Sequence, residues 1–184
     1  MNRTPSSRSA GFTLVEAMVA ISILALSITG PLTIAQKGIA SATYSRDQVT
    51  AFYLAQEAVE YIRNARDTNG NNGVDWMTSM GECLAQMCTI DARYAVTHAS
   101  ALSTFATENT PLISRNTSTS GASAGLYGYD ASTGWTPTIF RRTVSITPVG
   151  GDNKEVVVSV KILWNSNLFS PQKQFSVKEV LFNI

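Results

Sequence analysis

An apolar run near the N-terminus, from Phe12 to Ala35, constrains this chain more than any other feature, and Glu16 is its only charged residue. A helix of this length reaches about 36 Å, enough to cross a hydrocarbon core of about 30 Å. We therefore expect a membrane-spanning helix. Gly30 and Pro31 interrupt the run. Because proline removes a backbone hydrogen bond and glycine lowers helix propensity, we expect a kink at this pair.

A short polar leader, residues 1–11, precedes the run and carries Arg3 and Arg8 but no acid. Positive charge ahead of an apolar segment holds that end in the cytoplasm, so the rest of the chain is expected to be exported. A cleaved secretory signal is one alternative, since Ala40-Ser41-Ala42 offers a small-residue cleavage site, but the run is longer than such signals need. An ordinary membrane anchor is another, but it leaves the cost of placing Glu16 in a membrane unexplained.

The string Gly11-Phe12-Thr13-Leu14-Val15-Glu16, together with the basic leader and the long apolar helix, resembles the processing site of type IV pilins and type II secretion pseudopilins. The resemblance implies that prepilin peptidase cleaves between Gly11 and Phe12 and methylates the new N-terminus at Phe12. It also implies that Glu16 meets the N-terminal amine of a neighbouring subunit during assembly. The chemistry agrees, because glycine lets a protease approach the backbone and a helix N-terminus favours negative charge.

The same resemblance implies an α+β, pilin-like fold, in which a long N-terminal helix packs on a C-terminal antiparallel β-sheet. Beyond the membrane half, apolar residues recur at spacings of three and four, which predicts an amphipathic second half ending at about residue 66. Its predicted apolar face comprises Val49, Phe52, Leu54, Ala55, Ala58, Val59, Ile62 and Ala65. This face requires a sheet to cover it.

Three parts of the chain are therefore expected: a cleaved leader at 1–11, a transmembrane and assembly helix at 12–35, and an exported domain at 36–184. Within the exported domain we expect a variable loop region at 67–138 and a β-sheet at 139–184.

The turn-forming residues between Asp67 and Asp75 are expected to end the helix. Their side-chain oxygens suggest calcium, but the glycine falls one place late for an EF-hand loop, so we favour a plain turn. Cys83 and Cys88, the two cysteines of an exported chain, are predicted to form a disulfide that closes a small surface loop and fixes local shape.

Alternating apolar residues from Thr89 to Val96 predict a strand. His98 follows without a nearby nucleophile or acid, so we expect it to be structural. Residues 99–138 are rich in Ser, Thr, Gly and Ala, and this composition predicts an exposed variable loop.

The C-terminal part carries the clearest strand pattern. Apolar residues occupy every second position from Val156 to Trp164, which predicts a half-buried strand. A preceding strand around Phe140 has the same alternation, although Arg142 breaks its apolar side, and Phe175 to Phe182 forms a last strand. Short links between sequential strands favour an antiparallel sheet.

The sequence shows no nucleophile elbow, phosphate-binding glycine loop or metal-ligand cluster, so we expect neither an enzyme nor a cofactor or metal. The formal net charge is +1 and no strong basic block is present, so direct nucleic-acid binding is not expected.

We interpret the chain as a structural subunit of a type IV pilus, a type II secretion pseudopilus or a DNA-uptake filament. The stretch Ala55–Glu60 followed by Arg63-Asn64, and later Phe140–Val144, resemble minor pilins and minor pseudopilins. The expected partners are prepilin peptidase, other pilin or pseudopilin subunits and the inner-membrane assembly platform. The expected location is the inner membrane, crossed once, and then the filament. The alternatives are a membrane-anchored adhesin or binding module that does not polymerise, and an exported enzyme.

Overall fold

A computed structural model describes residues 11–95, 101–105, 110–150, 154–165 and 171–183. The predictions for the basic leader, Val96 and His98 lie outside these residues, except that Gly11 is described. The chain divides into two compact units, Met1–Ser45 and Arg46–Ile184, and each is considered by itself.

Helix α1 runs from Leu14 to Asn71, so it ends later than the predicted position near residue 66. The reason lies in Asn69, which is buried and whose amide donates to the carbonyls of Trp76 and Thr78 at 3.1 and 2.9 Å. These bonds hold the following loop against the end of the helix. An asparagine expected to break the helix is therefore its last buried anchor.

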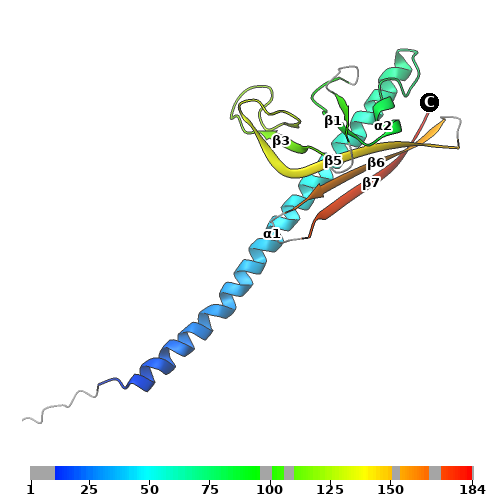
Figure 1. Ribbon diagram of the computed structural model, residues 1–184. Helices are drawn as coiled ribbons and strands as arrows, with labels where there is room; N and C mark the ends of the chain where they lie inside the picture. The colour runs from blue at the N-terminus through cyan, green and yellow to red at the C-terminus, as the bar shows by residue number, and fades with distance from the viewer. Residues whose placement is uncertain (1–10, 96–100, 106–109, 151–153, 166–170, 184) are drawn as a thin grey trace, which may run out of the picture. The chain divides into compact units, whose positions relative to one another are not determined.

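The second unit is an antiparallel sheet packed on its own part of α1 (Figure 1). Its elements are α2 Gly81–Ala85, β1 Cys88–Ile90, β2 Leu102–Thr104, β3 Leu112–Asn116, β4 Tyr127–Gly128, β5 Trp135–Val149, β6 Glu155–Trp164 and β7 Lys173–Phe182. Strands run in the order β2-β1-β5-β3-β4, while β6 pairs with β5 and with β7. The predicted α+β architecture, a long N-terminal helix followed by an antiparallel sheet, is confirmed.

The core forms where alternate residues of the sheet meet α1. The alternation predicted for β6 is confirmed, since Val156, Val158, Val160, Ile162 and Trp164 are all buried. Register places Val160 between Val144 of β5 and Val177 of β7. Burial of these apolar side chains is the main force that holds sheet and helix together.

The buried face of α1 is shifted from the predicted one. Small side chains at Ala51, Ala55 and Ala58 are fully buried and let the sheet approach the helix closely, whereas Val49 and Phe52 remain 54% and 40% exposed. Phe52 instead makes an edge-on ring contact with Phe175, at 5.8 Å between centroids. Helical periodicity identified the general face, but alanine content decides its centre.

Residues 99–138 are not one exposed loop, because β2, β3, β4 and the start of β5 lie within this range. Ile113 of β3 is fully buried, and β3 pairs with β5. Backbone pairing with a long central strand orders these short strands, and it leaves no apolar periodicity in the sequence. Residues 117–123 and Gly125 are exposed, whereas Ser114 and Asn116 are buried by the pairing of β3.

The strand predicted from Thr89 to Val96 is shorter, since β1 ends at Ile90. Asp91 stops it: its carboxylate accepts from the Arg93 backbone N–H at 3.2 Å, and its carbonyl accepts from the Tyr94 N–H. Such a side-chain-to-backbone bond turns the chain in place of continuing the ladder.

Candidate functional site

The predicted processing site lies in an accessible, non-helical segment. Gly11, Phe12 and Thr13 precede α1, and the Phe12 side chain is 77% exposed. Nothing lies within 4 Å of the position that a Cβ on Gly11 would occupy. The Gly11–Phe12 bond is therefore open to a protease on all sides that the structure describes.

Thr13 caps the helix that follows. The Glu16 backbone N–H donates to Thr13 Oγ1 at 3.2 Å, and Glu16 lies in the first turn of α1. A threonine cap followed three residues later by glutamate is the capping-box pattern, and a cap of this kind stabilises a helix by about 1 kcal/mol. Sequence reasoning missed this local role for Thr13, although the Thr-x-x-Glu spacing signals it.

Hydroxyl groups in the first unit's part of α1 bond to the turn before them. Ser22, Ser27, Thr29 and Thr33 donate to the carbonyls of Met18, Leu24, Leu26 and Thr29, at 2.8 to 3.0 Å. Each bond satisfies the hydroxyl inside the helix, so it needs no outside partner.

Glu16 differs from these hydroxyls. Among the residues that the structure describes, no cation or hydrogen-bond donor pairs with its carboxylate. A carboxylate in surroundings of low dielectric needs a cation to offset the loss of water. Glu16 is thus the one side chain of this apolar segment whose chemistry is incomplete within the described chain.

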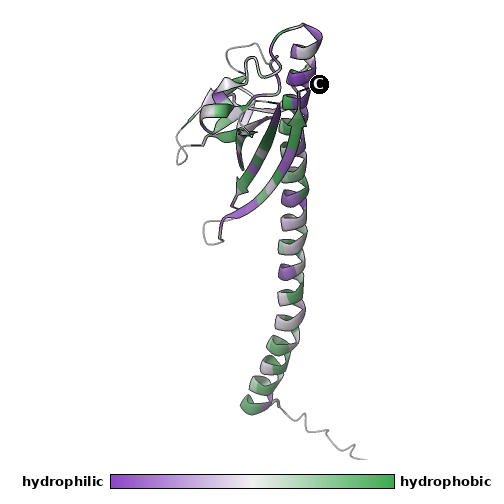
Figure 2. Cartoon of the chain, turned by 90° about the vertical axis from the view of Figure 1, so that its right-hand side faces the viewer, coloured by the Kyte–Doolittle hydropathy of each residue, from purple (hydrophilic) through white to green (hydrophobic). Residues whose placement is uncertain are grey.

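The surface around Glu16 is apolar. Between Phe12 and Ile39 the large apolar side chains are exposed by 53 to 77%. One helix in the described residues, α1, is long and apolar enough to cross a membrane, and Figure 2 shows hydrophobic residues gathered in its N-terminal turns. Such a surface requires lipid or other helices around it.

Gly30 and Pro31 lie inside α1, which continues through them as helix. Thr29 and Thr33, on either side, both bond to backbone carbonyls of the preceding turn. The kink predicted at this pair stays a prediction.

The family model for the prokaryotic N-terminal methylation motif matches residues 6–30. The chain carries the prepilin signature of type IV pilins and pseudopilins. The match includes Gly11, Phe12 and Glu16 and ends at Gly30, so Pro31 lies just outside it. Comparisons with curated proteins and with solved structures gave no match.

The prepilin signature belongs to structural subunits, not enzymes. It implies processing by prepilin peptidase and assembly with other pilin subunits. Together with the apolar helix it is consistent with anchoring in the inner membrane and export of the C-terminal domain.

In the second unit, Arg142 is the main buried charge, with 1% of its surface exposed. Its guanidinium donates to the Leu54 carbonyl at 2.8 Å, to Glu57 Oε2 at 2.6 Å and to the Ile90 carbonyl at 2.5 Å. The arginine that breaks the apolar side of β5 in the sequence therefore ties α1 and β1 to β5. It is part of the scaffold, and its partners could not be identified from sequence alone.

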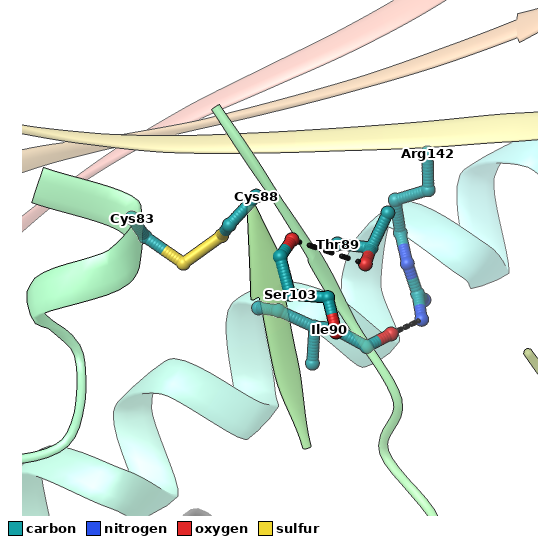
Figure 3. Close-up of a disulfide and its surroundings, with 6 residues drawn as sticks. All are labelled: Cys83, Cys88, Thr89, Ile90, Ser103 and Arg142. Atoms are coloured by element: carbon teal, nitrogen blue, oxygen red, sulfur yellow. Dashed lines mark hydrogen bonds between the residues drawn. A yellow bond between two sulfur atoms is a disulfide. The ribbon is translucent and has the colours of Figure 1, made fainter. Parts of the chain in front are cut away.

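The predicted Cys83–Cys88 disulfide is present, with 5.0 Å between Cα atoms, and it joins α2 to β1 (Figure 3). Both cysteines are buried in the core, so the expected surface position was wrong. Next to Cys88, Thr89 donates to the Ser103 carbonyl, and the Ile90 carbonyl accepts from Arg142. The disulfide thus fixes one end of a strand that Arg142 fixes at the other.

A second ion pair orders the loops beside β1. Arg93 contacts Asp91 at 2.6 Å and Asp130 at 3.0 Å, and it lies 4.3 Å from the centre of the Trp135 ring. Burial alone would raise the pKa of Asp91, but hydrogen bonds from Arg93 and from the Tyr129 N–H outweigh it and hold this pKa below its usual range. The cluster joins loops far apart in the sequence.

Metal binding finds no support here. No group of three or more His, Cys, Asp or Glu suited to a metal ion occurs among residues 11–95 and the later described segments. The turn considered for calcium begins with the last residues of α1, where Asn69 is committed to the Trp76 and Thr78 carbonyls.

Proposed function

We propose that this protein is a minor pilin or minor pseudopilin, a structural subunit of a type IV pilus, a type II secretion pseudopilus or a DNA-uptake filament. Prepilin peptidase removes residues 1–11, cleaving between Gly11 and Phe12, and methylates Phe12. Segment 12–35 then crosses the inner membrane, and the exported domain is carried at its far end. The inner-membrane assembly platform moves the subunit into the filament, where helices of other subunits replace lipid.

The unpaired Glu16 carboxylate on an exposed apolar helix carries this proposal. Every hydroxyl between Leu14 and Ala35 bonds within the helix, so Glu16 alone needs an outside partner. Cleavage after Gly11 creates a cation, the methylated amine of Phe12, at the N-terminus of this helix in every subunit. An offset of neighbouring subunits that brings this amine to Glu16 pairs the two charges in low dielectric, where the attraction is strong.

The Thr-x-x-Glu spacing allows a competing, purely local role for the Glu16 side chain, which in a capping box would accept from the Thr13 backbone N–H; the bond in the structure is the one from the Glu16 N–H to the Thr13 hydroxyl. Three substitutions separate the two roles. Glu16→Gln keeps a capping-box side chain but removes the charge, whereas Thr13→Ala removes the capping hydroxyl but keeps the charge. Charge pairing predicts that Glu16→Gln and Glu16→Ala are both cleaved yet absent from sheared filaments, and that Thr13→Ala is incorporated normally. The measurement is immunoblotting of membrane and filament fractions.

Incorporation of Glu16→Gln at the level of the unchanged protein, with Glu16→Ala excluded, would instead assign Glu16 to helix capping. Incorporation of both variants would remove Glu16 from assembly altogether.

Processing is tested separately by mass spectrometry of the mature N-terminus. We expect an N-methylated Phe12. A chain that begins after Ala42 would indicate secretion, and an intact Met1 would indicate an ordinary anchor. Either result contradicts the proposal.

The assignment as a minor subunit rests on the resemblance of Ala55–Glu60 with Arg63-Asn64, and of Phe140–Val144, to minor pilins. The retained Glu16 argues against the extreme tip, where no amine lies above it. Quantitative mass spectrometry of purified filaments should find this chain well below the abundance of the principal subunit. Equal or greater abundance would make it a major pilin.

A further inference from the structure

A groove of about 470 Å³ crosses the face of β5, β6 and β7 that points away from α1. On β5, Thr143, Ser145 and Thr147 alternate with Val144 and Ile146, which also border the groove but are buried in the core. The side chains that form its floor are Thr143, Ser145, Thr147, Ser159, Lys161, Ser176 and Lys178. The floor thus presents two ammonium groups and four hydroxyl groups, since Thr143 is buried and its hydroxyl donates to the Lys161 carbonyl at 3.4 Å.

Strand register arranges these groups in two rows. Thr143, Lys161 and Ser176 lie side by side across the three strands, and Ser145, Ser159 and Lys178 form the next row. The two lysines therefore lie diagonally, one strand and one row apart. Neighbouring strands are about 4.8 Å apart and rows about 7 Å, so both lysines can reach one ligand of moderate size.

The groove is positive without compensation. No Asp or Glu lines it, and among the described residues neither the Lys161 nor the Lys178 ammonium has an ion-pair partner. Glu179, the neighbour of Lys178, belongs to the opposite face, where it pairs with Arg63 of α1. A ligand here is expected to be an anion.

The wall of the groove is mostly apolar, with Gln86 as a polar exception, and it is fixed. Leu84 and Met87 line it beside Cys83, and the Cys83–Cys88 disulfide fastens this segment to β1. An apolar wall above a floor of hydroxyl groups suits a ligand with one hydrophobic face and many polar groups.

Backbone chemistry narrows the class of ligand. Over the floor, the β5, β6 and β7 backbones are paired with one another, so a ligand that lies across this face meets side chains; the unpaired outer edge of β7, where an extended peptide could add a strand, borders the floor and is not part of it. Recognition must use side chains, and each hydroxyl both donates and accepts. Sugar rings offer matching hydroxyl groups and apolar C–H faces. We propose that this groove binds an acidic oligosaccharide, with its carboxylates between Lys161 and Lys178.

This inference goes beyond filament assembly and does not depend on it, because the groove is complete within one chain. The full-length protein is tested in detergent micelles by titration calorimetry. Trigalacturonate, which carries carboxylates, is compared with maltotriose, a neutral chain of the same number of rings, and with a short oligothymidylate, a phosphate-bearing polymer.

We expect trigalacturonate to bind more tightly than both comparison ligands. Lys161→Ala and Lys178→Ala should each weaken it about threefold, as expected for exposed charge pairs, and the double variant about tenfold. Lys154→Ala removes one positive charge outside the groove and serves as the matched control, with affinity unchanged. Ser145→Ala with Ser159→Ala should weaken binding severalfold while keeping its salt dependence.

Failure of trigalacturonate to bind, or equal binding by the double lysine variant, overturns the proposal. Equal affinity for oligothymidylate would indicate that the ligand is a phosphate polymer and not a saccharide. Equal affinity for maltotriose would show that the ligand's charge does not contribute to binding. An unfolding temperature equal to that of the unchanged protein confirms that each variant is folded. Filament incorporation, measured on the same variants, reports on assembly separately.

Discussion

The two parts of helix α1 use the same backbone geometry in opposite ways. Up to Ser45, large apolar side chains are exposed, and the hydroxyl groups between Leu14 and Ala35 bond within the helix. From Arg46 onwards, small side chains are buried against a sheet, and charged ones pair with residues of distant strands, as Glu57 does with Arg142. The first part is stable only with lipid or other helices around it, whereas the second obtains its partners from its own chain.

The two parts of the helix therefore differ in what a substitution should affect. Substitutions in the first part should alter association and leave the folding of the exported domain unaffected. Substitutions in the second should lower the free energy of unfolding of that domain. Four predictions test this difference on the full-length protein in detergent, three by thermal unfolding and one, on the disulfide, by hydrogen exchange.

The largest effect is expected at Arg142. Arg142→Ala leaves the Leu54 and Ile90 carbonyls without their donor and Glu57 without its partner, in a site closed to water. Breaking a buried charged network in this way costs about 3–5 kcal/mol. The unfolding temperature of the domain should fall steeply.

Arg115→Ala is the matched control, since Arg115 is exposed and stacks only loosely on Tyr127, at 6.0 Å. Its effect should stay within about 0.5 kcal/mol. An equal loss of stability in both variants would show that Arg142 does not hold the second part of α1.

The same substitution placed in both parts of the helix gives the next effect. Ala58→Leu forces a larger side chain into a fully buried position, which costs about 1–3 kcal/mol. Ala25→Leu adds the same atoms at an exposed position of the first part. We expect no change in domain unfolding from Ala25→Leu, and a similar change from both would contradict the division of roles.

This division could be anticipated only partly from sequence. The string Gly11–Glu16 and the apolar run identified the first part, because a membrane helix is encoded by local composition. The alternation in β6 likewise predicted its buried face, since a half-buried strand has a period of two.

The remaining features depend on contacts between distant residues. In the sequence, Arg142 interrupts the apolar side of its strand. Its partners Leu54, Glu57 and Ile90 could not be identified there, because long stretches of chain separate them from it. The short strand β3 and the burial of Cys88 depend in the same way on pairing with β5. Sequence periodicity does not report such pairings. The Thr13 cap differs from them, because its Thr-x-x-Glu spacing is local and lies within the processing motif.

Loss of the disulfide should have an intermediate effect. Replacing Cys83 and Cys88 by alanine frees a short loop, worth about 2 kcal/mol in loop-closure entropy. Because β1 loses one of its two fixed ends, hydrogen exchange at Ile90 should accelerate, while exchange in the first part of α1 stays unchanged. Unaltered exchange at Ile90 would mean that Arg142 alone holds the strand.

The smallest effect is expected from acidification, which changes the unfolding temperature only when Asp91 becomes protonated. The folded pKa of Asp91 lies below its unfolded value of about 3.8, since hydrogen bonds from Arg93 and Tyr129 outweigh burial. The stability that Asp91 contributes is therefore present above the unfolded pKa and is lost as the pH falls through the folded pKa. The unfolding temperature of the domain should drop below about pH 4, and Asp91→Asn should flatten that drop.

Asp130 gives a graded comparison for the same cluster. Hydrogen bonds from Ser132, followed by that from Arg93, lower its pKa to about 2, but its side chain is 27% exposed against 4% for Asp91, so water compensates for more of its charge. Asp130→Asn should consequently leave most of the acid-induced drop in place. If Asp130→Asn flattens the profile as much as Asp91→Asn, the stabilising charge of this cluster lies at the surface of the domain. In that case Arg142 would be the buried charge that distinguishes the internally paired second part of the helix and its domain from the exposed first part.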